Sequence, residues 1–203
     1  MEAVARRKSR IVATTDFRGR KIIVEESFPK RAQHMGWFFL TARDGAGKLV
    51  ADAHFSLEHS FMPMKKGHLA VAGIKVGKYL PGFSNPFLAL ITGLASRSRV
   101  NLISTVYSMD EKRITHAQLR AWHSMHGFRR TCVNDDTIGN DNIMDRPFNA
   151  PLHEALFRKF RIAKGYALPD ALEAYNIIQG LKGKKGEMRH GEKITDREKK
   201  AVF

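Results

Sequence analysis

The sequence predicts a mixed α/β fold of the α+β kind, in which a mostly antiparallel sheet contains one βαβ crossover. Residues 10–76 alternate apolar and polar side chains with the period of a half-buried strand, and turn signals separate the runs. Residues 87–107 change to helical spacing and then return to a strand-like run. A strand, a helix and a strand in succession indicate a crossover, so hairpins and a crossover share one sheet.

The first four strands are expected as two hairpins, followed by a fifth strand. Asp16–Gly19 and Asp44–Gly47 are the turn signals, because Asp and Gly accept turn conformations that other residues resist. The paired runs are residues 10–13 with 21–25 and residues 37–41 with 49–55, and the fifth strand covers residues 68–76.

The middle of the chain predicts two helices among three further strands. The first helix covers residues 87–100, with Asn85 as its cap and Pro86 at its first position. The second ends at Gly127, which is a natural helix stop. The remaining predicted elements are a strand over 102–107, a helix over 111–126, and short strands over 128–133 and 142–145.

The character of the chain changes after Pro147. Residues 151–163 and 169–178 have helical spacing, and a Gly- and Lys-rich stretch then begins near Leu181. We therefore expect a domain over residues 1–147 with an N-terminal hairpin, a helical extension over 148–180, and a basic tail over 181–203 that becomes ordered on a partner.

The charge balance predicts a polyanionic partner. Lys and Arg number 35 against 20 Asp and Glu, which gives a net charge of +15. Such a field attracts phosphate polyanions, so RNA, DNA or a nucleoprotein is the first partner to consider. An anionic membrane surface, an acidic protein, or a basic surface without a specific partner are the alternatives that charge alone leaves open.

Cysteine and hydropathy patterns favour a cytoplasmic protein, of a cell or of a virus in its host. The single Cys132 cannot form an internal disulfide, and we expect it to be a small core residue rather than a nucleophile. The N-terminal residues show no secretory signal, and no apolar run approaches the roughly 20 residues of a membrane span.

Two motifs resemble the GNAT acetyltransferases. Leu119–Phe128 (LRAWHSMHGF) is similar to the last helix and turn of that family, with Trp122 at the place of a leucine and His123 at the place of a tyrosine. Met144–Pro147 (MDRP) resembles the Met-x-Arg-Pro that closes the last GNAT strand. The resemblance covers residues 37–147 and implies a GNAT-like sheet with acetyl-CoA as cofactor.

In that family the loop after the strand at residues 68–76 holds the cofactor pyrophosphate through helix-terminal amides. Here the loop matches loosely, and an ordinary strand-to-helix loop is the alternative. Residues 26–36 are also too few for the two helices that wall the acceptor site in the family, so this side must be built differently. The resemblance implies that acetyl-CoA is held by Ile74, Val76, Lys78, Gly82, Ser84 and Asn85.

Three residues are candidates for proton transfer. His123 replaces the tyrosine that often reprotonates the CoA thiolate, and Tyr107 is an alternative acid. Glu58 is a candidate base through a water, as are its neighbours His54 and His59. Each of these side chains also has an ordinary structural role open to it. No group of residues suggests a metal site.

The basic residues that we expect to contact nucleic acid lie in the C-terminal part. Arg158, Arg161 and Lys164 have a spacing that would place them along one face of the predicted helix at residues 151–163. The tail adds Lys182, Lys184 and Lys185. The sequence therefore leaves two functions open: an N-acyltransferase acting on an amine of a nucleic-acid-associated or acidic target, or an inactive GNAT-like adaptor of a nucleoprotein or virion.

Overall fold

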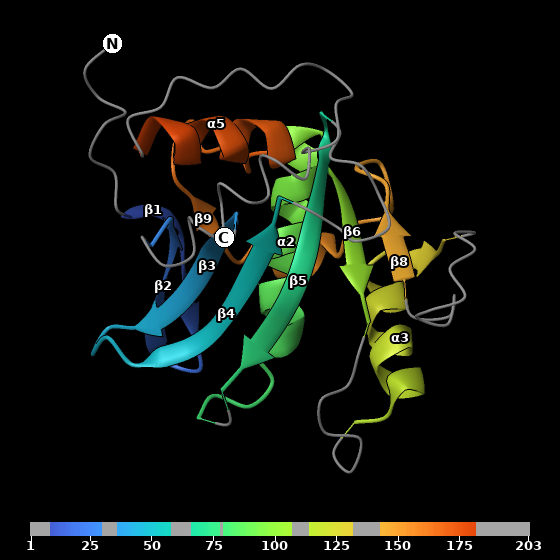
Figure 1. Cartoon of the computed structure of the whole chain (residues 1–203). Coiled ribbons are helices and arrows are strands. Elements are labelled where there is room, and N and C mark those ends of the chain that lie inside the picture. The colour runs from blue at the N-terminus through green and yellow to red at the C-terminus, as the bar shows by residue number, and fades with distance from the viewer. Residues whose placement is uncertain are drawn as a thin grey trace.

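A single nine-stranded sheet forms the centre of the part of the chain that the computed structural model describes, residues 9–29, 36–57, 66–77, 79–106, 114–131 and 143–181 (Figure 1). The strand order is β7-β8-β6-β5-β4-β3-β2-β1-β9. The strands are β1 Ser9–Phe17, β2 Arg20–Ser27, β3 Trp37–Asp44, β4 Leu49–Ser56, β5 His68–Val76, β6 Asn101–Thr105, β7 Arg129–Arg130, β8 Ile143–Arg146 and β9 Arg161–Ile162.

The sheet is antiparallel except between β5 and β6, which are parallel and are joined through a helix. The predicted fold class, with hairpins and one crossover in a common sheet, is therefore confirmed. The described helices are α2 Ser84–Ser98, α3 His116–Met125, α4 Glu154–Phe157 and α5 Ala171–Leu181.

One face of the sheet, here called the inner face, carries the core. Side chains alternate along each strand, so Leu40 and its partner Ala53 are fully buried while Phe39 and its partner His54 on the outer face are half-buried. The middle of α2, from Pro86 to Ala95, is buried against the inner face, and Figure 1 shows α2 behind β4 and β5.

The strands β5 and β6 pair over only part of their length. Their register runs from His68 opposite Asn101 to Val71 opposite Ser104 and then stops. A register shift between β4 and β5 leaves Ala72 without a partner on β4, and such a bulge bends and twists a strand. The second half of β5 therefore turns away from β6, and Figure 1 shows the two strands diverging toward their C-terminal ends.

Both central helices begin at positions other than those predicted. The helix α2 begins at Ser84, before the predicted cap, so Asn85 is a helical residue and not the cap. Pro86 is tolerated there because the N–H groups of a first turn have no helical partner. The helix α3 begins at His116, because Thr115 and Gln118 form a reciprocal capping box. Gly127 ends it with a φ of +84°, as predicted.

The predicted helix over residues 151–163 is wrong. Only Glu154–Phe157 is helical, and the chain then joins the sheet as β9 beside β1. The Thr15 hydroxyl donates to the Lys159 carbonyl at 2.8 Å, and the Ala163 amide donates to the Val12 carbonyl at 2.8 Å. Pairing with a strand far away in the sequence thus overrides a local helical pattern.

The C-terminal segment packs into the same core as the sheet. Phe157, Phe160 and Leu168 are buried in the main hydrophobic cluster. Asp170 caps α5 by accepting from the Glu173 amide at 2.9 Å, and it also accepts from the Gly67 amide at 2.6 Å just before β5. The predicted domain boundary at Pro147 stays a prediction, and the predicted tail lies outside the described residues.

Arg146 joins the elements that surround the diverging strands. Its side chain is fully buried without a carboxylate partner in the described part of the chain, and burial lowers its pKa to about 10. Oxygen atoms from α2, from the end of α3 and from the segment after β8 surround the guanidinium. The acceptors are the Ser96 hydroxyl and the carbonyls of His126, Pro147, Ala150 and Pro151, at 2.8–3.3 Å.

Replacement of Arg146 by Met should destabilise the protein by about 3 kcal/mol, because buried carbonyls lose their donors. Urea unfolding followed by circular dichroism measures this loss. The matched control is Arg129→Met, since Arg129 is exposed on the neighbouring strand β7. We expect the control to shift stability by less than about 0.5 kcal/mol. Equal stability of both variants would show that the hydrogen bonds of Arg146 do not hold these elements together.

Candidate functional site

The N-terminus of α2 lies in the loop that follows the diverging strand β5. Phe83 precedes the helix in a helical conformation and provides no side-chain cap. Among the described residues, the amides of Ser84 and Asn85 have no hydrogen-bond acceptor. Free amides and the positive end of the helix dipole favour an anion at this position.

The turn between β1 and β2 brings a cation to this loop. Arg18 and Gly19 both have positive φ, at 50° and 72°, which is the conformation of a two-residue hairpin turn. The Arg18 guanidinium approaches Gly82, where a Cβ would stand 3.5 Å from Nη2. The Phe17 and Phe83 rings pack edge to face at 5.3 Å and hold the hairpin against the loop.

The loop is also fixed at Tyr79, on the side of the β3–β4 turn. Its hydroxyl donates to Asp44 and accepts from Arg20, and the Lys48 ammonium lies 3.5 Å from its ring centroid. The hydrogen bond from Tyr79 lowers the pKa of Asp44 and raises the pKa of Tyr79. Tyr79 is therefore bound by the β3–β4 turn and by Arg20 at the start of β2.

The helix α3 is attached to the start of α2 by one side-chain hydrogen bond. Trp122 Nε1 donates to the side-chain oxygen Oδ1 of Asn85 at 2.6 Å. The neighbouring His123 is buried, and its Nδ1 lies 2.9 Å from the Leu119 carbonyl. That contact requires the proton on Nδ1, and burial lowers the pKa of His123. The ring is thus neutral with its lone pair on Nε2, and it is better prepared to accept a proton than to donate one.

His54 lies beside the point where β5 and β6 separate. It faces Gly73 across the β4–β5 pair, next to the unpaired Ala72. A Cβ at Gly73 would stand 2.4 Å from His54 Nε2, so the ring lies across the bare glycine backbone. Burial lowers the pKa of His54, with smaller effects of Asp52 and Lys75 in opposite directions. A neutral imidazole at this position is a proton acceptor.

The predicted site residues fall into three groups. Gly82, Ser84 and Asn85 lie together at the start of α2, and Ile74 and Val76 are half-buried on the inner face of the diverging part of β5. His123 lies near this group through its neighbour Trp122. The residues that lie outside the described part of the chain are Tyr107, Glu58 and Lys78.

Arg18 escaped the sequence prediction, because it belongs to a remote hairpin and no local signal indicates that its turn contacts Gly82. His54 was one of three candidate bases in the sequence, beside Glu58 and His59, and the sequence did not distinguish among them. Its position depends on the register of β4 and β5, which brings it opposite a glycine. A glycine inside a strand is the one sequence signal for such a close approach.

The predicted basic helix face does not exist. Arg158 ends α4 and pairs with Glu154 at 2.8 Å, Arg161 lies in β9, and Lys164 lies in the turn that follows. Lys182, Lys184 and Lys185 lie outside the described residues. Among the described residues, no group of three or more His, Cys, Asp or Glu could hold a metal, and no helix has the length and apolar character to cross a bilayer.

No family model and no curated protein matches this chain. Solved structures that match include a cAMP-binding acyltransferase from Mycobacterium smegmatis, at 14% identity and TM-score 0.43 over 83% of this chain and 56% of that one. Another is Tetrahymena GCN5, at 12% identity and TM-score 0.40 over 58% of this chain and 71% of that one. A third is a chimera of the spermidine N-acetyltransferase SpeG from Vibrio cholerae and hSSAT, at 9% identity and TM-score 0.38 over 56% of this chain and 66% of that one.

The chain spans just over half the length of the mycobacterial acyltransferase, 56%. The strand order and the parallel β5–β6 pair joined through α2 agree with the GNAT-like sheet that the sequence motifs implied.

Replacement of Gly73 by Ala should displace the His54 ring, because the new Cβ would overlap Nε2. Burial lowers the pKa of His54, so a displaced and more exposed ring should titrate closer to the ordinary value of about 6.5. NMR titration of the imidazole measures the change. The control is Gly45→Ala, which meets no atom within 4 Å. An unchanged titration in the Gly73 variant would contradict the contact between the two residues.

Proposed function

We propose that this protein is a GNAT-like N-acyltransferase that uses acetyl-CoA to acylate an amine. The observation that carries the proposal is the separation of β5 from β6 after Val71, next to the uncapped start of α2. Free backbone groups of a strand, free helix-terminal amides and a nearby guanidinium meet at this one place. Together they match a ligand that has amide groups in its arm and phosphates at its end.

The residues present fit such a cofactor. The amides of Ser84 and Asn85 together with Arg18 would hold its pyrophosphate. The second half of β5, including Ile74 and Val76, has no partner on the β6 side among the described residues and would hold the amide-containing arm. When bound, acetyl-CoA supplies an acyl group activated as a thioester.

His54 is the residue that we assign to deprotonation of the acceptor amine. Its pKa is lowered, so its neutral form predominates at neutral pH and Nε2 can accept the proton. Gly73 positions the ring at the point where the strands separate. His123 and Tyr107 stay as candidates for returning a proton to the leaving sulfur. His123 would first have to gain that proton on Nε2, because its Nδ1 proton is held by Leu119.

The net charge of +15 supports an acceptor on a nucleic-acid-associated or acidic target. The alternative function, an inactive basic adaptor, would be favoured by side chains that fill the cofactor site. Phe83 and Phe87 are instead part of the core, and Tyr79 is held by Asp44 at the β3–β4 turn. The described residues therefore give no support to a filled site.

Calorimetric titration with acetyl-CoA tests the cofactor site. Arg18→Asn removes the guanidinium and keeps the left-handed turn, which Asn adopts readily. We expect about tenfold weaker binding of acetyl-CoA, equivalent to the loss of one charge-assisted contact. An acetyl thioester of N-acetylcysteamine, which lacks phosphate, should bind both proteins equally. Lys66→Gln is the control for loss of one exposed charge.

Two results would count against this function. If nucleic-acid-free wild-type protein releases no heat on titration with acetyl-CoA, the enzyme hypothesis is rejected and the adaptor hypothesis is favoured. Equal affinity of wild type and the Arg18 variant would show that the cofactor phosphates do not lie at the start of α2.

His54→Gln should lower kcat by about a hundredfold with little change in the KM for acetyl-CoA, because the base acts on the acceptor. Release of CoA thiol in the presence of spermidine or a lysine-containing peptide measures the rate. The wild-type rate should rise with pH through the lowered pKa of His54 and then level off, since only the neutral imidazole is a base. A His54→Gln enzyme with an unchanged rate and pH profile would exclude this role.

A further inference from the structure

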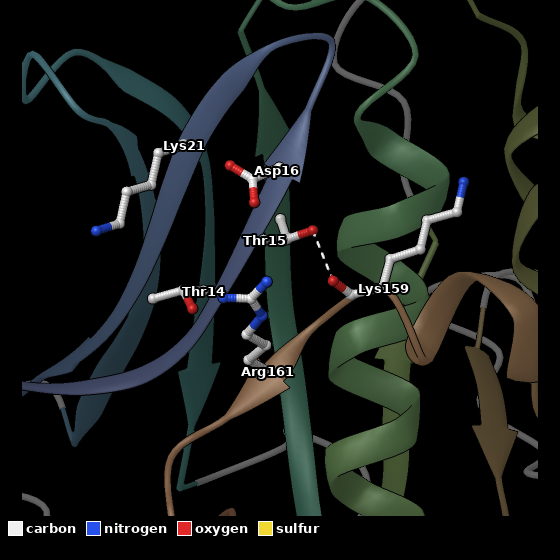
Figure 2. Close-up of a pocket in the computed structure, with 6 residues that line it drawn as sticks. All are labelled: Thr14, Thr15, Asp16, Lys21, Lys159 and Arg161. Atoms are coloured by element: carbon white, nitrogen blue, oxygen red, sulfur yellow. Dashed lines mark hydrogen bonds between the residues drawn. The ribbon is translucent and has the colours of Figure 1, made fainter.

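A pocket of about 420 Å³ lies at the edge of the sheet where β1, β2 and β9 meet, and Figure 2 shows the residues that line it. Its volume falls within the roughly 300–1,000 Å³ of typical small-ligand sites. Six residues line it, namely Thr14, Thr15, Asp16, Lys21, Lys159 and Arg161.

The pocket brings together two basic segments that are far apart in the sequence. Arg161 on β9 pairs in register with Thr14 on β1, and Asp16 pairs with Lys21 on β2. The hydrogen bond from the Thr15 hydroxyl to the Lys159 carbonyl, at 2.8 Å, fixes the segment that carries Lys159 (Figure 2). The arrangement is therefore built by strand pairing and not by chance proximity of flexible side chains.

The three cations of the pocket have no ion pair among the described residues. Lys21, Lys159 and Arg161 are all exposed. Arg158 and Arg10, in contrast, are each neutralised by a carboxylate: Arg158 pairs with Glu154 at 2.8 Å, and Arg10 pairs with Glu26 at 2.8 Å. The pocket is thus a place where the excess positive charge is available to a ligand.

We propose that this pocket binds a nucleotide unit of a nucleic acid strand. Lys21, Lys159 and Arg161 would contact phosphates, and the Thr14 hydroxyl adds a neutral donor. Asp16 is an acceptor only, so it suits a sugar hydroxyl or a base N–H. A ligand with both phosphates and such donors matches this combination.

The composition of the pocket argues against two other anionic partners. No large apolar side chain lines it, so it offers nothing for insertion into a membrane. Asp16 repels a ligand that carries only negative charge, such as polyphosphate or an acidic peptide. The inference goes beyond acyl transfer and does not depend on it, because binding is measured without acetyl-CoA.

Fluorescence anisotropy with a labelled oligouridylate of roughly 20 nucleotides tests the pocket. The double variant Lys21→Gln/Arg161→Gln should bind at least about tenfold more weakly, and its salt slope should fall by about 1.4, or 0.7 for each phosphate contact. The matched control, Lys66→Gln/Arg97→Gln, removes one exposed Lys and one exposed Arg that likewise have no ion pair among the described residues. The affinity of this control for the oligouridylate should fall by less than about threefold. Equal losses in the two variants would overturn the proposal.

Asp16→Asn distinguishes a nucleotide site from a plain cationic surface. We expect this variant to bind the oligouridylate more weakly, because one acceptor oxygen is replaced by an NH2 donor that cannot accept from a sugar hydroxyl or base N–H. It should bind inorganic polyphosphate more tightly, because the negative charge that repels this ligand is removed. Tighter binding of both ligands would overturn the nucleotide assignment, and so would displacement of the oligonucleotide by poly-L-glutamate at equal charge concentration.

A final experiment tests whether this pocket is distinct from the proposed cofactor site. The Lys21→Gln/Arg161→Gln variant should bind acetyl-CoA as wild type does, and free CoA should not displace the oligonucleotide. Displacement by CoA would assign the pocket to the cofactor instead. Loss of nucleic-acid binding with intact acetyl-CoA binding supports the proposal, whatever the outcome of the acyl-transfer experiments.

Discussion

The buried guanidinium of Arg146 is the interaction on which the arrangement of the candidate site depends. It bonds to the end of α3 through His126 and to α2 through Ser96, and it extends from β8 next to β6. An uncompensated buried charge is costly unless hydrogen bonds satisfy it, so the surrounding oxygens cannot move independently. Because α3 is held at this end, Trp122 can reach Asn85 at the start of α2.

The bulge at Ala72 is the second constraint, since it decides where the sheet opens. Pairing of β5 with β6 ends one residue before it, and His54 faces Gly73 one residue after it. The opening, the position of His54 and the part of β5 that has no β6 partner among the described residues therefore follow from one irregularity in register. The start of α2 belongs to the same region because Phe17 of the first hairpin packs against Phe83, and Arg18 of the same hairpin approaches Gly82.

The sequence predicted those features that are encoded locally. Period-two runs and Gly-containing turns identified β1–β5, and Gly127 marked the end of α3. The helix predicted over 151–163 failed because strand pairing with β1 is a contact across the whole chain. Contacts between distant segments also limit what could be predicted of the candidate site. Gly82, Ser84 and Asn85 form one loop in the sequence, whereas Arg18 and His54 join them only through tertiary contacts that no periodicity reveals.

The positive charge of the chain divides into two roles once the contacts are known. Arg146 is buried as a structural donor, and Arg10, Arg20 and Arg158 are each balanced by a carboxylate within 4 Å. Lys21, Lys159 and Arg161 are exposed and have no such partner in the described part of the chain. Clusters of basic residues in the sequence are therefore a poor guide to a binding surface. Three of the unbalanced charges lie together where β9 joins the sheet, because that strand brings its cations beside the polar rows of β1 and β2.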